Sequence, residues 1–514
     1  MRRTDFLHVQ PSIPLMLISA FLLVGYVAVI TFWFHISNWW LFVMLIIGQL
    51  YFLLLGLTYV HSIWRVPKTS SRIDKDFRPS VDVFITVCGE PIELIEKTLR
   101  GALADRYEKK NIYILNDGKV AQTDNWRAVE VLAEKLGVTC ITRDIPGGAK
   151  AGNINHALSL TDGEIVIVLD ADHVPKPALI QTLISPFKEQ KMGFVQAPQY
   201  YYNQKRNRVT AASWAQQSLF FGVINQGRSR FYGNTMCGTN MAIRRSTLKE
   251  VGGMDEENIA EDFLTGMKIH GLGYKSQYIP KILAEGLAPE DFCSYYRQQL
   301  RWAKGNLEVL FRYNPLLFPG LTLAQRISYF SSALYYLLGL VVFLNALLPL
   351  IYLFTGAVPF LTDTMVLAAA FLPFIFFTLY NLQHSSNFTY TYQGIAYSIG
   401  TFPITLQALF ETILGKKRSF AVTSKVDLAG NYPSLVIFQM TYIILVVVGV
   451  SYNLLVNGLS PALITNTVWA SFYVVCFSTV SFAAMPDLAR YVVYIGKKTF
   501  PIKTTNLFNH RKRA

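Results

Sequence analysis

The chain has 514 residues, of which 52% are hydrophobic and 16% are charged. Soluble domains usually carry about 25% charged residues, so this composition excludes a wholly soluble protein and places part of the chain in a membrane. The formal net charge of +14 would suit a nucleic-acid partner. The positions of the basic segments favour an anionic membrane surface instead, and we expect no nucleic acid to bind.

The N-terminal region (1–64) contains two apolar stretches, at residues 14–34 and 39–64. Each is about as long as the ~20 residues that a spanning helix needs. The first lacks the small-residue cleavage site of a signal peptide, and the second follows at once. We therefore predict two transmembrane helices.

Residues 65–311 have the composition of a soluble α/β domain. Strands are predicted at residues 81–87, 111–115, 138–142 and 164–170, and helices at residues 91–104, 126–136 and 151–158. This alternation predicts a parallel, right-handed, doubly wound sheet. Neither G-x-G-x-x-G nor the phosphate loop G-x-x-x-x-G-K is present, which disfavours a dinucleotide fold and a P-loop NTPase.

The stretch 164–173, EIVIVLDADH, is a predicted buried strand that ends in two aspartates. Asp170 and Asp172 would lie at the carboxyl end of the strand, where open α/β sheets bind their ligands. Two carboxylates this close raise each other's pKa unless a divalent cation lies between them. We therefore predict a Mg²⁺ or Mn²⁺ site for a phosphorylated substrate, to which His173 could add a ligand. The alternative is that Asp172 caps the next helix and Asp170 is a solvated strand end.

Two further segments could bind a nucleotide. Thr86 and Glu90 follow the first predicted strand and Asp117 follows the second. An acid there can accept from a ring N–H or a ribose hydroxyl, and ordinary turn chemistry is the alternative. Lys150 opens a helix within GGAKAGNIN (147–155). A helix N-terminus beside an ammonium group is a phosphate site, unless the helix start merely happens to carry a lysine.

Two later segments could carry the chemistry. Glu261 and Asp262 open an apolar helix, where carboxylates are ordinary caps. A positioned carboxylate can also take a proton from a sugar hydroxyl as it attacks. Gln298, Arg301 and Trp302 share one helix face. Arginine offers a fork for a diphosphate and tryptophan a flat face for a pyranose ring.

The region after residue 311 returns to apolar spans, predicted at residues 327–355, 365–382, 435–456 and 467–484. The segment 397–414 is broken by Gly400 and Pro403 and is predicted to lie at the membrane interface. In this layout the basic N-terminus, the basic segment 416–425 and the basic tail (495–514) fall on the same side as the soluble domain. The positive-inside rule then places that domain in the cytoplasm and the membrane region at 312–494.

The five cysteines are scattered, odd in number and lack a C-x-x-C pair. This spacing argues against a disulfide framework and a zinc site, and it favours a reducing compartment around the soluble domain. The five are Cys88, Cys140, Cys237, Cys293 and Cys476.

Five motifs occur in order along the chain: Asp117, Lys150 within AKAGN, DADH at 170–173, AED at 260–262 and QQLRW at 298–302. Together they resemble the signature of processive family-2 glycosyltransferases. Residues 420–425 (FAVTSK) resemble the F-x-V-T-x-K gating loop of cellulose synthases, and residues 237–240 (CGTN) resemble the segment that lines their acceptor site. The resemblance runs from about residue 80 to about residue 430.

The resemblance implies a role for each matching residue. The donor nucleotide would be held by Thr86, Glu90, Asp117, Lys150, Gln298 and Arg301. Asp170, Asp172 and His173 would bind Mg²⁺ or Mn²⁺. Asp262, beside Glu261, would be the general base. The acceptor would lie against Trp302, Cys237, Gly238 and Thr239, and the gating loop (416–430) would act through Phe420, Val422, Thr423 and Lys425.

The fold implied by the resemblance is a GT-A-type, Rossmann-like glycosyltransferase domain inserted in an α-helical transmembrane bundle of about six spans. The implied activity is processive, inverting polymerisation of UDP-glucose into a β-glucan, either cellulose or a related capsular or exopolysaccharide glucan. The growing polymer would cross the plasma membrane. The alternatives are another β-linked polymer made from UDP-N-acetylglucosamine, as in chitin and hyaluronan, and a non-processive transfer to a lipid.

Departures from the family pattern limit this reading. Asn116-Asp117 replaces the usual pair of aspartates, and Ala260 replaces the threonine of T-E-D. Thr235-Met236 stands where two phenylalanines usually precede Cys-Gly, which leaves the glycosidic linkage open. About thirty residues follow the last predicted span, too few for a PilZ domain, so we expect no regulation by cyclic-di-GMP in cis.

Overall fold

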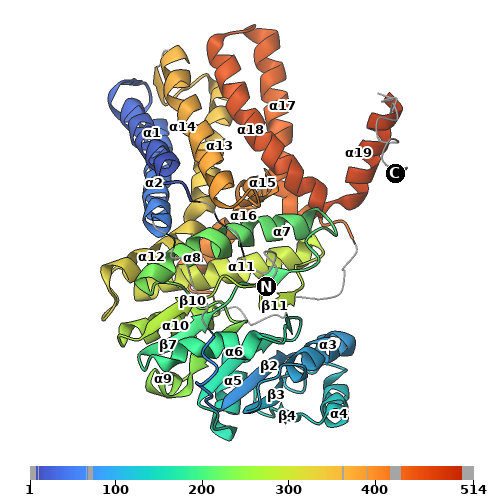
Figure 1. Ribbon diagram of the computed structural model, residues 1–514. Coiled ribbons are helices and arrows are strands. Elements are labelled where there is room, and N and C mark those ends of the chain that lie inside the picture. The colour runs from blue at the N-terminus through green and yellow to red at the C-terminus, as the bar shows by residue number, and fades with distance from the viewer. Residues whose placement is uncertain are drawn as a thin grey trace, which may run out of the picture.

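The computed structural model describes residues 7, 9, 11–64, 66, 73–361, 364–390, 392–416 and 430–499. A helical bundle forms one end of the molecule and an α/β domain the other, with a layer of helices that includes α7 and α11 between them (Figure 1). The predicted gating residues Phe420, Val422, Thr423 and Lys425 lie outside the described residues.

The first two spans form as predicted. Helices α1 (Ile13–Phe32) and α2 (Trp39–Ile63) are long and apolar, with boundaries within two residues of the predicted ones. The side chain of Asn38 caps α2 by accepting hydrogen bonds from the backbone N–H groups of Trp40 and Leu41, each over 3.1 Å.

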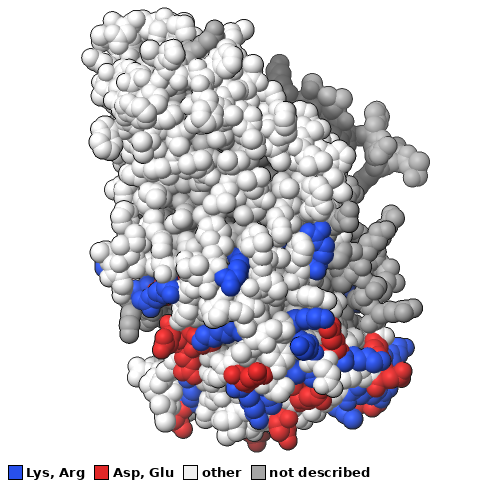
Figure 2. Space-filling view, turned by 90° about the vertical axis from the view of Figure 1, so that its left-hand side faces the viewer, with Lys and Arg blue, Asp and Glu red and all other residues white. Residues whose placement is uncertain are grey.

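The later spans follow the α/β domain. They comprise α12 (Leu323–Leu334), which continues through a 3₁₀ turn into α13 (Leu338–Thr355), then α14 (Thr364–Ser385), α17 (Ile437–Val456) and α18 (Pro461–Ala484). Within the described residues, six helical segments are long and apolar enough to cross a membrane. On the face shown in Figure 2, Lys, Arg, Asp and Glu lie at the α/β end, with a row of basic side chains at the border of the uncharged part. The chain is a multi-pass membrane protein.

The predicted interfacial segment forms two short helices, α15 (Tyr392–Gly400) and α16 (Phe402–Ile413). At 1.5 Å per residue, neither reaches the roughly 30 Å of a bilayer core. Pro403 occupies the first turn of α16, where its missing N–H is not needed, so the break at this proline separates two helices. The last described helix, α19 (Pro486–Thr499), follows α18 directly.

The α/β domain is built on a seven-stranded sheet in the order β10-β7-β9-β5-β2-β3-β4. The strands are β2 (Val81–Val87), β3 (Lys110–Asn116), β4 (Thr139–Thr142), β5 (Ile165–Asp170), β7 (Met192–Gln196), β9 (Met241–Arg244) and β10 (Lys275–Tyr278). The four strands β2 to β5 are parallel to one another, as predicted.

The sheet as a whole is mixed, because β9, a strand that was not predicted, runs antiparallel to both β5 and β7. The chain leaves β7 at the carboxyl edge of the sheet and forms α7 (Arg208–Ser218) and α8 (Asn225–Arg228), which pack toward the bundle (Figure 1). It then re-enters the sheet from that same edge, so the next strand must run backwards. Residues 237–240, which precede β9, therefore lie at the carboxyl edge.

Helices cover both faces of the sheet, which explains why β5 is apolar throughout. Helices α3 (Ile92–Leu103), α4 (Trp126–Leu136) and α6 (Leu179–Ile184) pack on one face, where Ile85 and Ile167 are fully buried. Helix α5 (Ala149–Leu160) packs on the other, where Phe84 and Val168 are fully buried.

Two more helices complete the carboxyl edge, α10 (Glu261–Gly271) and α11 (Phe292–Glu308). Gly305 of α11 lies against Ala260, the residue before α10, with no room for a side chain on the glycine. A small sheet in the order β6-β11-β8 flanks the edge, formed by β6 (Val174–Pro175), β11 (Ala284–Gly286) and β8 (Tyr200–Tyr201).

Candidate active site

The carboxyl edge brings together side chains from distant parts of the sequence. The register of β2 and β5 pairs Thr86 with Asp170, and the Thr86 hydroxyl lies 3.4 Å from an oxygen of that carboxylate. Asp117 follows β3, the other neighbour of β2. Lys150 extends from the first turn of α5. Residues predicted from separate motifs therefore share one edge.

Asp170, Asp172 and His173 form a candidate metal centre. One potential ligand atom from each residue lies within 4.8 Å of those of the other two. Asp172 and His173 are buried, and the imidazole Nδ1 lies 3.3 Å from Asp172 Oδ1. The other oxygen of Asp172 accepts from the backbone N–H of Leu287 over 3.2 Å, which fixes the carboxylate in place. Two carboxylates and an imidazole suit a hard divalent cation such as Mg²⁺ or Mn²⁺.

The ammonium group of Lys150 links the metal centre to the segment before β9. It donates to a carboxylate oxygen of Asp170 and to the carbonyl oxygen of Gly238, the latter over 2.8 Å. Burial alone would lower the pKa of Lys150, but the carboxylates of Asp170, Glu261 and Asp262 together outweigh burial, and the pKa is raised. The lysine therefore remains a cation at neutral pH.

The backbone of Gly238 also lies against the predicted base. Its φ is +74°, and a Cβ placed there would lie 2.9 Å from a carboxylate oxygen of Asp262 and 3.6 Å from Lys150 Nζ. Only glycine allows this backbone conformation and this close approach together. The structure thus places the predicted base, the predicted phosphate-binding lysine and the predicted acceptor segment side by side.

The carboxyl group of Asp262 has an unusual acidity. Burial, and next the neighbouring Glu261 carboxylate, raise its pKa to about 7. Burial also raises the pKa of Glu261, while Lys150 and Arg301 act against this rise. A carboxylate with a pKa near neutral pH is well matched to accepting a proton from a hydroxyl.

Helix α11 brings Arg301 of its predicted face near this cluster. Gln298 is buried and Trp302 is half-buried. Arg301 lies within electrostatic reach of Glu261 and Asp262, whose pKa values it lowers. The close contact of Gly305 with Ala260, one turn beyond Arg301, holds the two helices in this arrangement.

Asp117 has a partner that the sequence analysis missed. The guanidinium of Arg143 donates to both carboxylate oxygens, over 2.9 and 2.8 Å, and both side chains are buried. The register of β3 and β4 pairs Asn116 with Thr142, so the next residue of each strand meets the other. Arg143 could have been found in the sequence, because it is a basic residue that directly follows the predicted strand 138–142. Glu90 accepts from the backbone N–H of Cys88 over 2.6 Å, a turn-stabilising contact.

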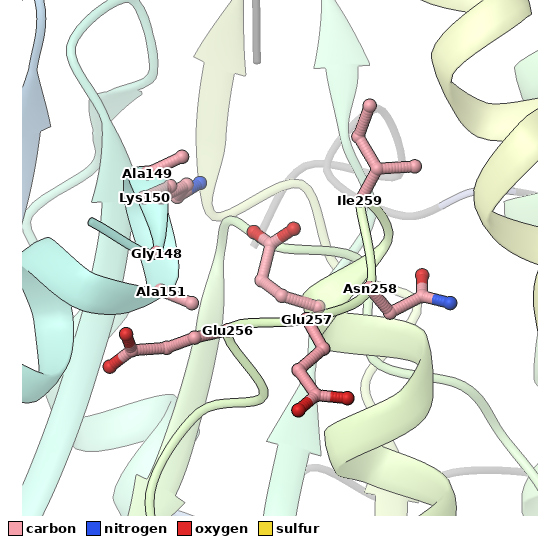
Figure 3. Close-up of a pocket in the computed structure, with 9 residues that line it drawn as sticks. Gly148, Ala149, Lys150, Ala151, Glu256, Glu257, Asn258 and Ile259 are labelled. Atoms are coloured by element: carbon pink, nitrogen blue, oxygen red, sulfur yellow. The ribbon is translucent and has the colours of Figure 1, made fainter. Parts of the chain in front are cut away.

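A pocket of about 150 Å³ lies beside this cluster, between the start of α5 and residues 256–261 (Figure 3). The exposed carboxylate of Glu256 lies against Gly148, at the N-terminus of α5. The pocket is smaller than the roughly 300–1,000 Å³ typical of small-molecule sites.

Thr235 and Met236, which depart from the family pattern, are buried in the domain. Their exposed fractions are 1% and 2%. Met236 packs into the core against Gly266 of α10, and the backbone N–H of Thr235 donates to the side chain of Asn225 over 3.1 Å. The hydroxyl of Thr235 lies 4.0 Å from the sulfur of Cys237, so this pair of residues lies directly beside the predicted acceptor segment.

Two family models match the chain. Residues 79–305 match the model described as glycosyltransferase like family 2, and residues 248–485 match the model described as cellulose synthase. The cellulose synthase catalytic subunit (UDP-forming) of Pseudomonas fluorescens is 32% identical over 380 residues, covering 71% of this chain and 50% of the relative. The same subunit of Komagataeibacter sucrofermentans is 28% identical over 501 residues, covering 92% of this chain and 63% of the relative. This chain thus spans half to two-thirds of the length of these relatives.

A solved structure supports the fold. The mannosyltransferase PcManGT from Pyrobaculum calidifontis, in complex with GDP-Man and Mn²⁺, matches with a TM-score of 0.54 at 18% identity, covering 73% of this chain and 100% of that one. The predicted GT-A-type fold is confirmed. So is the predicted resemblance to family-2 glycosyltransferases and cellulose synthases.

Proposed function

From this similarity to family-2 glycosyltransferases and cellulose synthases, we propose that the protein polymerises UDP-glucose into a β-glucan and passes the chain across the plasma membrane. The observation that carries the proposal is the contact between Gly238 and Asp262. In support of the proposal, a carboxylate with a pKa of about 7 lies beside a cationic lysine and the candidate metal centre. A base beside a diphosphate-binding site is the arrangement that sugar transfer requires.

The donor would lie along the carboxyl edge of the sheet. Asp117, held by Arg143, would accept from the uracil ring, with Thr86 and Glu90 nearby. Asp170, Asp172 and His173 would hold Mg²⁺ or Mn²⁺, which when bound neutralises charge on the diphosphate. The negative charge of Asp170, which already binds the ammonium group of Lys150, would also attract the divalent cation.

The reaction follows from the positions of the charged groups. Asp262 would take the proton from the acceptor hydroxyl while that oxygen forms a bond to the anomeric carbon. The bond from this carbon to the diphosphate oxygen breaks, and its electron pair leaves with UDP, so the configuration inverts. Lys150, Gln298 and Arg301 would stabilise the departing diphosphate. Trp302 would support the acceptor ring, beside Cys237, Gly238 and Thr239.

The path of the product would lead into the bundle. Tyr336, in the span Leu323–Thr355, lies within electrostatic reach of Asp262 and Cys237, so the site is at the foot of a span. Buried Gln439, Tyr442 and Ser481 in α17 and α18 each have a polar side-chain atom without a partner among the described residues. Polar groups inside a bundle mark substrate pathways, and sugar hydroxyls could bind to these.

The layout of the chain supports the proposed topology. The catalytic domain (65–311) would face the cytoplasm, between two N-terminal spans (1–64) and a C-terminal channel region (312–494). The row of basic side chains beside the uncharged part fits an anionic cytoplasmic leaflet (Figure 2). The gating loop (416–430) and basic tail (495–514) would lie on this same side.

Donor selectivity tests the proposal. The purified full-length protein in nanodiscs is incubated with Mg²⁺ or Mn²⁺ and radiolabelled UDP-glucose or UDP-N-acetylglucosamine, with Asp262→Asn as the inactive control. We expect polymer from UDP-glucose alone, and none from the variant. Polymer from UDP-N-acetylglucosamine alone would refute the donor, and a single sugar added to lipid would refute processivity. Linkage-specific glucanases then identify the bond.

A further inference from the structure

The segment from Cys237 to Asn240 contacts three residues of the candidate site, Asp262, Lys150 and Asp170. Gly238 lies against Asp262, and its carbonyl oxygen accepts from Lys150 over 2.8 Å. The hydroxyl of Thr239 accepts from the backbone N–H of Asp170 over 2.9 Å. One short stretch of backbone thus sets the positions of the base, the lysine and a metal ligand relative to one another.

This stretch lies outside the sheet, so the ladder of β9 does not hold its first residues. The pairing of β9 begins only at Met241. Gly238 and Asn240 both have positive φ, at +74° and +55°, which interrupts regular pairing. Backbone groups in such a segment need other partners, because buried N–H and C=O groups are almost always hydrogen-bonded.

Two glutamines supply these partners from the end of β7. Gln196 accepts from the backbone N–H of Cys237 over 2.9 Å and donates to the carbonyl of Thr239 over 2.8 Å. Gln199 donates to the carbonyl of Cys237 over 2.6 Å. The peptide groups on either side of Cys237 are therefore both held by carboxamides. The carbonyl of Cys237 also accepts from the backbone N–H of Thr239 over 2.9 Å, a donor that belongs to the same segment, whereas Gln199 ties this carbonyl to the chain beyond β7.

We propose that Gln199 is a positioning residue that sets the distance of Gly238 from Asp262, and so aligns the acceptor hydroxyl with the base. This rests on the proposed function. The carbonyl of Cys237 belongs to the peptide bond that leads into Gly238. Without Gln199 this carbonyl keeps the N–H of Thr239, which lies in the same turn and moves with it. The peptide can then shift relative to β7, and the contact between Gly238 and Asp262 changes with it. The donor contacts of Asp117 and Arg143 lie on another strand pair and are unaffected.

Gln199 also offers a clean test. It is half-buried, whereas Gln196 is fully buried and makes several bonds whose loss would disturb the fold. Gln181 provides a matched control, because its half-buried side chain also donates to a backbone carbonyl, that of Asp74, over 2.6 Å. Gln181 lies on α6, away from the carboxyl edge.

The first experiment compares Gln199→Met, Gln199→His and Gln181→Met in nanodiscs. Loss of the donor in Gln199→Met is expected to slow polymer formation about tenfold, the worth of one good hydrogen bond. The KM for UDP-glucose should change less than about threefold, and more UDP should be released per sugar incorporated, because misaligned acceptor lets water compete. Histidine carries an N–H at a similar reach and should restore most of the rate. Unchanged coupling in Gln199→Met, or an equal loss in Gln181→Met, would overturn the proposal.

A second measurement does not depend on the substrate. Hydrogen exchange of the backbone amides at residues 237–241 should be faster in Gln199→Met than in the wild type, with little change elsewhere in the domain. Equal exchange in the two proteins would refute the positioning role, even if the wild type makes no polymer from UDP-glucose. An inactive wild type with the expected exchange would refute the proposed function alone.

Discussion

The acidity of Asp262 gives the most quantitative prediction. Its pKa of about 7 arises from burial and, next, from the Glu261 carboxylate. A base must be ionised to accept a proton, and a group with this pKa is about 9% ionised at pH 6 and about 91% at pH 8. The turnover rate should therefore rise about tenfold between these values. Removing the neighbouring charge in Glu261→Gln should move the midpoint of the profile to lower pH.

The assay is the initial rate of UDP release with saturating UDP-glucose, measured every half unit of pH from about 5.5 to about 8.5. Glu256→Gln is the matched control. Glu256 is exposed and lines the same pocket as Glu261, but it does not contribute to the raised pKa of Asp262. A profile that is flat across neutral pH would refute the reasoning. So would a midpoint that stays in place or rises in Glu261→Gln, or one that falls equally in Glu256→Gln.

Four other perturbations follow from the same contacts. Because its pKa is raised, Asp262 stabilises the fold while it is protonated, and this stabilisation is lost as pH rises through about 7. The difference in Tm between Asp262→Asn and the wild type should therefore be larger at pH 8 than at pH 5, and an equal difference at the two pH values would contradict this. Arg143→Leu leaves the buried carboxylate of Asp117 unpaired and should cost about 3–5 kcal/mol in denaturant unfolding, whereas no loss would show that the pair is dispensable. Gly238→Ala should reduce polymer formation at least about tenfold, because the added methyl group strains the backbone and meets Asp262. Gly137→Ala is the control and should not reduce it, since Gly137 has a similar φ of +66° but open space around it. Equal effects of the two substitutions would point to backbone strain alone. EDTA should weaken binding of UDP-glucose in calorimetry, and Mn²⁺ or Mg²⁺ should restore it; unchanged binding would exclude a metal-bridged donor.

The local elements were predictable because their signals are local. The apolar run of β2 and the spacing of α4 gave boundaries that match the structure residue for residue, at Val81–Val87 and Trp126–Leu136. Both lie in the parallel half of the domain, where β2 is buried on two faces and is apolar apart from Thr86 and from Asp82, which pairs with Arg245. The spans were predictable for the same reason, since length and hydropathy alone mark them.

The direction of β9 could not be predicted, because it depends on where the chain goes between strands. Nothing local in Met241–Arg244 distinguishes a parallel from an antiparallel strand. The intervening helices α7 and α8 lie toward the membrane bundle, and this detour determines the edge from which the strand enters. The position of residues 237–240, the predicted acceptor segment, follows from the route that the chain takes between β7 and β9.

The site was predicted unevenly. Charged residues that end strands or begin helices, such as Asp117, Lys150 and Asp262, stand out because carboxylates and ammonium groups are unusual beside apolar runs. Their partners did not, because Arg143 and Gln199 are ordinary residues until the fold places them against a carboxylate and a carbonyl. Thr235-Met236 drew attention as a departure from the family pattern, but both side chains are buried.

The most direct test of the account is polymer synthesis by the full-length protein in sealed proteoliposomes. UDP-glucose, labelled in the sugar, is supplied only to the outside, and molecules with an outward-facing catalytic domain are the only ones that can use it. The account predicts a long, labelled glucan in the lumen, protected from glucanase added outside until detergent opens the vesicles, and absent with Asp262→Asn. Label that is fully open to external glucanase, or that remains on a lipid as a single sugar, would contradict synthesis coupled to passage through the bundle.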